Sequence, residues 1–93
     1  MAKRRSRPSN VPDDTQAVAG MVTSIGAVIE KRFTFELDTH GVEPSEFFID
    51  MIKPDGENLR QLVIQAFQER WILSVLWKGD PPEAIQLKAT RLP

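Results

Sequence analysis

The chain has 93 residues and a mass of 10.5 kDa, and 41% of its residues are hydrophobic while 27% are charged. This length allows one domain with little room for an enclosed active site, and the composition is that of a soluble globular protein rather than a disordered one. Cysteine is absent, which excludes disulfides, thiolate nucleophiles and Cys-based metal centres and leads us to expect an intracellular, cytoplasmic protein.

The formal net charge of −1 conceals an uneven distribution along the chain. The first twelve residues contain no acidic side chain, whereas residues 13–93 carry eight basic and 13 acidic ones. We therefore predict a flexible basic arm over residues 1–12 and a single compact acidic domain over residues 13–93. The arm is a candidate nucleic-acid-binding segment because its cations attract phosphates at long range, and an arm that only improves solubility is the equally weighted alternative. Its basic residues are Lys3, Arg4, Arg5 and Arg7.

Neither a secretory signal nor a membrane span is expected. The polar stretch Pro8–Gln16 stands where the apolar region of a signal peptide would be. The longest strongly apolar run, Trp71–Trp77, has seven residues, well short of the roughly 20 that a spanning helix needs. We therefore expect no membrane association.

Residues 17–29 are compatible with two different structures. Their apolar side chains occur at helical spacing, but Gly20 and Gly26 each cost about 1 kcal/mol in a helix, and the many Val, Thr and Ile residues favour strands. We therefore expect a β-hairpin that turns near Ser24–Gly26. Alternating apolar and polar residues predict its second strand, most clearly over Arg32–Leu37.

Two helices are expected in the middle of the chain. Pro44 suits a first helical position, and Phe47, Phe48, Met51 and Ile52 then share one face of a helix that ends before Pro54. A second helix follows a turn at Asp55-Gly56, because residues 59–69 repeat apolar side chains at helical spacing. An all-β alternative builds a hairpin from Phe47–Ile52 and Leu59–Phe67 instead.

Two further strands complete the chain. Trp71–Trp77 favours a strand that is buried on both faces, Gly79–Pro82 a turn, and Ala84–Leu92 an alternating strand. The element order β-β-α-α-β-β predicts an α+β fold in which a small antiparallel sheet of about four strands carries two short helices on one face. The ranked alternative is an all-β sandwich or barrel.

The candidates for catalysis are few. His40 is the one histidine and lies near Asp38 and Glu43, but an exposed loop histidine is favoured over a metal ligand or a general base. The carboxylates Glu36 and Asp38 fall on the predicted wet face of a strand. No serine lies in a Gly-x-Ser-x-Gly motif, and the spacing of the glycines does not match a phosphate-binding loop. We therefore expect no catalytic residue, metal site or cofactor, and a protein that is not an enzyme.

Trp71 and Trp77 are the candidate protein-interaction residues, because tryptophan is enriched in binding hot spots, although core packing is the favoured role for both. The leading functional hypothesis is a small non-enzymatic interaction or accessory module whose acidic body contacts a protein partner. The alternative is a nucleic-acid-associated protein that contacts phosphates through its N-terminal arm. A homo-oligomer is compatible with either hypothesis.

Overall fold

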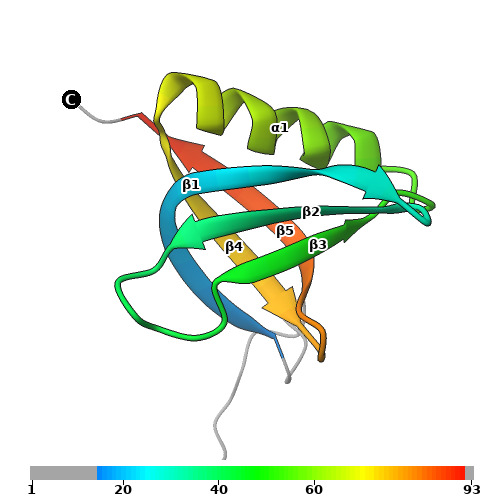
Figure 1. Ribbon diagram of the computed structural model, residues 1–93, viewed down its shortest axis with the longest axis horizontal. Coiled ribbons are helices and arrows are strands. Elements are labelled where there is room, and N and C mark those ends of the chain that lie inside the picture. The colour runs from blue at the N-terminus through cyan, green and yellow to red at the C-terminus, as the bar shows by residue number, and fades with distance from the viewer. Residues whose placement is uncertain (1–14, 92–93) are drawn as a thin grey trace, which may run out of the picture.

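A computed structural model describes residues 15–91, so the predicted arm lies outside the described residues. The five strands form one mixed sheet that closes into a barrel in the order β1-β2-β3-β5-β4, and a single helix lies against it (Figure 1). The chain is thus a small α+β domain. Its elements in chain order are β1 (Gln16–Ile29), β2 (Arg32–Asp38), β3 (Glu46–Asp50), α1 (Gly56–Glu69), β4 (Ile72–Lys78) and β5 (Glu83–Thr90).

The barrel closes through a short parallel contact. All other neighbouring strands are antiparallel, but β3 and β5 run parallel and pair only at Phe48 and Glu83. The N–H of Phe48 donates a hydrogen bond to the carbonyl of Pro82 at this point. Beside it, the ammonium of Lys53 forms an ion pair of 2.5 Å with Glu83. The expected antiparallel sheet of four strands is therefore wrong. The sheet has five strands, and two of them, β3 and β5, run parallel to each other.

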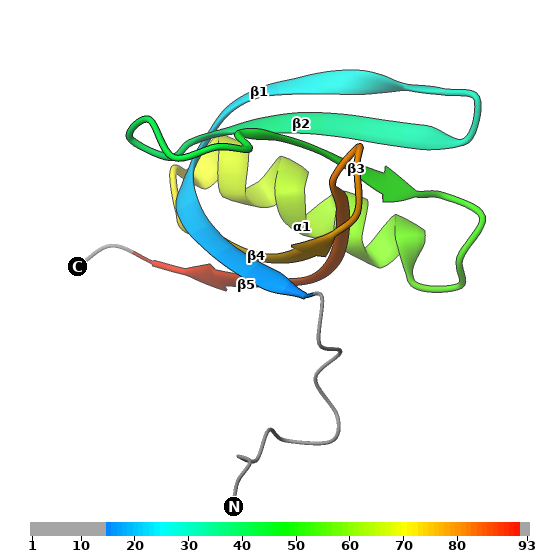
Figure 2. The same ribbon diagram turned by 90° about the horizontal axis from the view of Figure 1, so that it is seen from below.

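Strand β1 serves two parts of the barrel. Its first part, Gln16–Met21, pairs with β4, and Met21–Ile29 pairs with β2. The hairpin between β1 and β2 turns at Glu30 and Lys31 (Figure 2) and not near Ser24–Gly26 as expected. Both turn residues have positive φ, 52° and 65°, a conformation that usually selects Gly, Asn or Asp in tight hairpins. A Glu-Lys pair has no such preference, so the sequence gives no turn signal at the true position of the hairpin.

The core is built from alternate residues of the strands and one side of α1. Phe33 and Phe35 of β2 point inward, and the ring of Phe35 stacks on that of Phe47 from β3 with 5.7 Å between centroids. Because strand side chains alternate between faces, the residues between them point out of the barrel. The buried apolar set is Val22, Phe33, Phe35, Leu37, Phe47, Ile49, Val63, Ala66, Leu73, Val75 and Ala84.

The helix predicted over residues 44–53 is wrong, since this segment contains strand β3. Phe47 and Ile49 are buried while Phe48 between them is half-buried, which is the two-residue period of a strand. Pairing with β2 and burial beside Phe35 outweigh the helical grouping of the apolar residues. The all-β alternative anticipated a strand here and a barrel, but its second strand, Leu59–Phe67, is helical.

The remaining elements form where they were expected, except that β4 is buried on one face only: Leu73 and Val75 are buried and the residues between them are half-buried, so the expected burial on both faces is wrong. The predicted second helix is α1, which presents Val63 and Ala66 to the barrel and ends at Glu69, where Arg70 caps it in a left-handed conformation. The predicted strands Arg32–Leu37, Trp71–Trp77 and Ala84–Leu92 correspond to β2, β4 and β5 within one or two residues. Over residues 15–91, no helix combines the length and the apolar character needed to cross a membrane.

Candidate functional site

The outer face of β2 and β3 brings together a cation, an aromatic ring and a hydroxyl. Thr34 of β2 lies opposite Phe48 of β3, and Arg32 lies one outward position further along β2. All three point away from the core because their neighbours Phe33, Phe35 and Phe47 are buried. The sheet itself therefore places these three side chains on one surface.

The guanidinium of Arg32 lies over the ring of Phe48, with 4.4 Å between its carbon and the ring centroid. Such a cation–π contact at an exposed site is worth about 0.5–1 kcal/mol. We call Arg32 and Phe48 together the platform. Arginine and phenylalanine are both side chains on which bases stack.

The platform forms part of a pocket of about 170 Å³ at this face. Prolines 81 and 82 of the β4–β5 loop supply its other wall, because the β3–β5 contact holds this loop next to Phe48. Pockets that enclose drug-sized ligands measure about 300–1,000 Å³. This pocket therefore suits one planar group of a larger ligand lying along the surface. Its lining consists of Arg32, Thr34, Glu46, Phe47, Phe48, Pro81 and Pro82.

The charge around the platform is mixed. Arg32 is paired across the sheet with Asp50, and Glu46 also lines the pocket. On the same face, Glu36 accepts a hydrogen bond of 2.9 Å from the hydroxyl of Ser24. Residues 15–91 as a whole contain eight basic and 11 acidic side chains. The platform thus provides a stacking surface and one cation, Arg32. Its surroundings provide few further positive charges for binding a polyanion.

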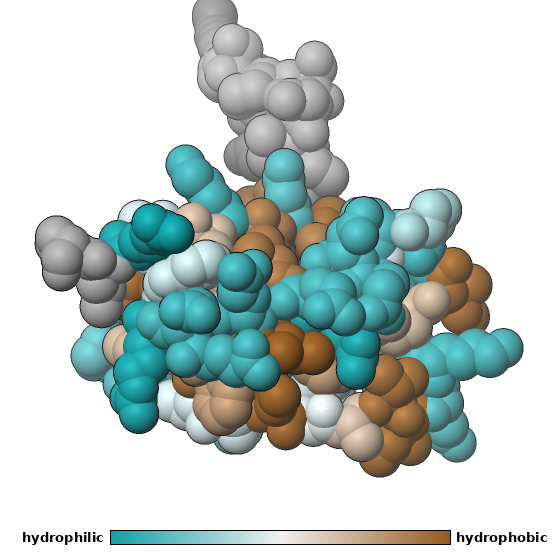
Figure 3. All heavy atoms as spheres, turned by 90° about the horizontal axis from the view of Figure 1, so that it is seen from above, coloured by the Kyte–Doolittle hydropathy of each residue, from teal (hydrophilic) through white to brown (hydrophobic). Residues whose placement is uncertain are grey.

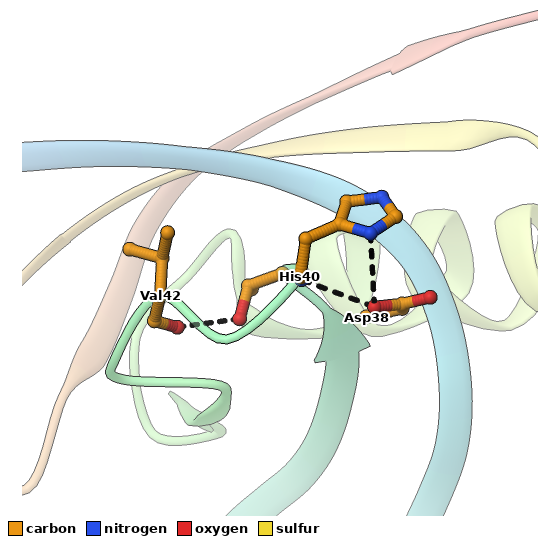
Figure 4. Close-up of polar contacts among 4 residues, drawn as sticks. Asp38, His40 and Val42 are labelled. Carbon is orange, nitrogen blue, oxygen red and sulfur yellow. Dashed lines mark hydrogen bonds and ion pairs between the residues drawn. The ribbon is translucent and has the colours of Figure 1, made fainter.

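His40 lies apart from this platform, in the loop that follows β2 (Figure 4). Its ring is turned toward Asp38, with 3.8 Å between Nδ1 and a carboxylate oxygen, and its side chain is 87% exposed. Its backbone N–H donates to the same carboxylate. Among residues 15–91 no group of three or more potential metal-binding side chains occurs. The arrangement is that of a loop histidine whose backbone is held by its neighbouring carboxylate.

Trp71 and Trp77 are both half-buried and pack against the core. Trp77 contacts the ring of Phe47 at a centroid distance of 6.1 Å, and the guanidinium of Arg91 lies 5.6 Å from the Trp71 ring. Trp71 lies just before β4, and Trp77 is its second-last residue. The favoured packing role accounts for the contacts of both side chains.

A second hollow of about 280 Å³ lies on the outer face of β1, β4 and β5. Alanine, leucine and the stems of polar residues line it, including Ala17, Leu76 and Lys88. Its polar lining residues are Ser74, Gln86 and Lys88.

No protein-family model, curated protein or solved structure matches the chain. Of the platform residues, the sequence assigned Arg32 and Thr34 to the outer face of a strand, but it placed Phe48 in a helix. Phe48 was missed because its pairing partner, β2, lies ten or more positions earlier in the chain. The turn at Gly79–Pro82 was predicted, and only the barrel places it beside Phe48.

Proposed function

We propose that this protein binds single-stranded nucleic acid without catalysing a reaction. The platform of Arg32 on Phe48, open to solvent beside the β4–β5 loop, is the observation that carries the proposal. Base stacking on aromatic side chains contributes about 1–3 kcal/mol per base and tolerates any sequence. A pocket of this size fits one base, while the rest of the strand lies along β2 and β3.

The fold supports the same proposal. A five-stranded barrel in this strand order, with a helix between the third and fourth strands, has the topology of an OB-fold. OB-folds bind oligonucleotides and oligosaccharides across strands 2 and 3 and the adjoining loops. The platform lies on the corresponding face. This likeness is one of fold, so the proposal depends on the side chains of the site.

Phosphate contacts are assigned to the N-terminal segment that contains Lys3, Arg4, Arg5 and Arg7. Gln16 pairs with Trp77 near the end of β4, two residues before the β4–β5 loop begins, and this loop supplies Pro81 and Pro82 to the pocket beside the platform. A chain spans at most about 3.3–3.6 Å per residue. The eight residues between Arg7 and Gln16 therefore allow up to about 30 Å of reach, enough to bring a cation to a strand bound at the platform.

Fluorescence anisotropy with a labelled single strand of about 16 nucleotides tests the proposal, with a duplex as comparison. We expect preference for the single strand and at least a tenfold loss of affinity in Arg32→Ala or Phe48→Ala, since about 1.4 kcal/mol corresponds to a factor of ten. The matched control is Arg91→Ala, which removes another arginine over an aromatic ring, directly after the end of β5. Equal losses in both arginine variants would contradict a specific role for the platform.

Deleting residues 2–7 tests the phosphate contacts separately. Each phosphate contact contributes about −0.7 to the slope of log affinity against log salt on single strands, so removing four cations should flatten the slope by about 3. Affinity that falls while the slope stays unchanged would contradict phosphate contacts by this segment.

A protein-interaction role is the second candidate, favoured by the apolar side chains exposed near the end of β1. Ile25, Val28 and Ile29 are 36%, 47% and 68% exposed, and exposed apolar patches commonly mark protein contacts. Failure of every nucleic acid to bind at low salt would remove the first proposal and leave this one.

A further inference from the structure

We infer that β1 is the dimerisation element of this protein and pairs antiparallel with β1 of a second copy. The pairing runs along the edge of Val22–Ile29 that faces away from β2. This inference does not depend on nucleic-acid binding, because it rests on the free edge, the charge pattern and the exposed side chains of β1 alone.

Within residues 15–91 this edge has no strand partner, and α1 is the helix that contacts β1. From Met21 to Ile29, β1 pairs with β2 on one side, and its pairing with β4 ends at Met21. No described strand pairs with the other side of Val22–Ile29. At about 3.3 Å per residue these eight residues present an edge of about 26 Å, with a row of backbone donors and acceptors.

The strand lacks the charges that normally protect an edge. Natural edge strands are kept from pairing by charged residues, proline and bulges. The 14 residues of β1 include no charged residue and no proline, although 27% of the whole chain is charged. Of these three devices, β1 has only shifts of register, between Val22 and Ser24 and between Ile25 and Val28.

An uncharged strand suits a second copy in particular. A two-fold axis places each surface against itself, so a charged residue near the axis would face an identical charge. In β1 no such repulsion arises, and the nearest charges, Glu30 and Lys31, lie together at the turn with opposite signs. A partner that binds through charged side chains would have no oppositely charged residue on this strand to contact.

Burial of apolar surface supplies the driving force. Ile25, Val28 and Ile29 belong to the six large apolar residues exposed among residues 15–91. Ile25 and Val28 lie opposite the inward residues Phe35 and Phe33, so they extend the inner layer beyond the barrel. Figure 3 shows apolar side chains gathered at the lower right, where the β1–β2 hairpin ends, beside the hydrophilic outer surface of α1. A second β1 would cover this apolar end.

Sedimentation equilibrium of the full chain tests the inference. We expect a concentration-dependent species of twice the 10.5 kDa chain mass. Val28→Lys should weaken the association at least about tenfold, because juxtaposed like charges cost several kcal/mol. The matched control Val42→Lys changes the same residue type, 58% exposed, in the loop between β2 and β3, and should leave the association unchanged.

Disulfide trapping tests the geometry without a large perturbation, since the chain has no cysteine of its own. Single variants Ser24→Cys, Ile25→Cys, Ala27→Cys and Val28→Cys are oxidised, with Val42→Cys as control. An antiparallel pair about a two-fold axis brings a residue within disulfide distance of its own copy only near the axis. Cross-linking should therefore peak at one or two positions of β1.

Results of three kinds would overturn the inference. The first is a monomer at every concentration. The second is cross-linking at Val42 that equals that in β1, or equal weakening by the two lysine variants. The third is a dimer that forms only after residues 2–12 are deleted. This result would mean that the N-terminal segment occupies the edge of β1 in the full chain. A dimer that forms in the absence of nucleic acid but binds none would support this inference while contradicting the proposed function.

Discussion

Strands β1 and β2 form one hairpin, but they present opposite chemistry to solvent. The seven residues of β2 include Arg32, Glu36 and Asp38 on the outer face, whereas β1 has no charge in 14 residues. A charged strand remains solvated and orients polar ligands, while an uncharged strand with an open edge gains by being covered. The comparison indicates that one hairpin can provide a ligand surface and an association surface, because the two strands separate these tasks.

The largest expected effect is on the free energy of unfolding, and it distinguishes a core residue of β3 from its neighbour on the outer face of β2 and β3. Phe47→Ala removes a ring that is 1% exposed and stacked on Phe35, and should cost about 3–5 kcal/mol of unfolding free energy. Phe48→Ala removes the half-buried outer ring and should cost about 1 kcal/mol. Urea denaturation measures both. Equal costs would show that the outer ring belongs to the core rather than to a ligand surface.

The turn that joins the two strands provides the next test. Glu30 and Lys31 both have positive φ, which costs a non-glycine residue roughly 1 kcal/mol. Glu30→Asn combined with Lys31→Gly supplies the residues that a two-residue hairpin prefers and should raise the unfolding free energy by about 1 kcal/mol. Thermal unfolding would then shift upward by about 4–8 °C. A lower melting temperature would contradict the proposed backbone cost.

The smallest expected effect is on the pH dependence of stability. It concerns the ion pair between Lys53 and Glu83 beside the contact of β3 with β5. The hydrogen bond from Lys53 to Glu83 is the main cause that raises the pKa of Lys53 above its usual value. A raised pKa in the folded state contributes stability that is complete below the unfolded pKa, near 10.4, and is lost as the pH rises through the folded pKa. Because Lys53 is 47% exposed, the contribution should stay below about 1 kcal/mol.

Comparing the wild type with Lys53→Met at neutral and alkaline pH measures this contribution. The difference in unfolding free energy between the two proteins should be larger at neutral pH and should shrink above pH 10 or so. A difference that grows with alkaline pH would contradict the assigned cause.

Local sequence determined much of this protein. The alternation over Arg32–Leu37 predicts β2, and the helical spacing from Leu59 onward predicts α1, because each pattern reflects which side of one element is buried. The strands β4 and β5 and the turn between them follow from the same reasoning. The missing cysteines and the uneven charge also come directly from the composition.

Tertiary structure decided the rest. The segment Phe47–Ile52 has apolar residues that suit a helix or a strand, and only pairing with β2 selects the strand. The parallel contact of Phe48 with Glu83 joins residues 35 positions apart, so no local pattern announces it. The platform of Arg32 and Phe48 depends on both of these long-range contacts. The periodicity of apolar residues predicts which face of one element is buried. Which elements contact each other depends on how the barrel closes.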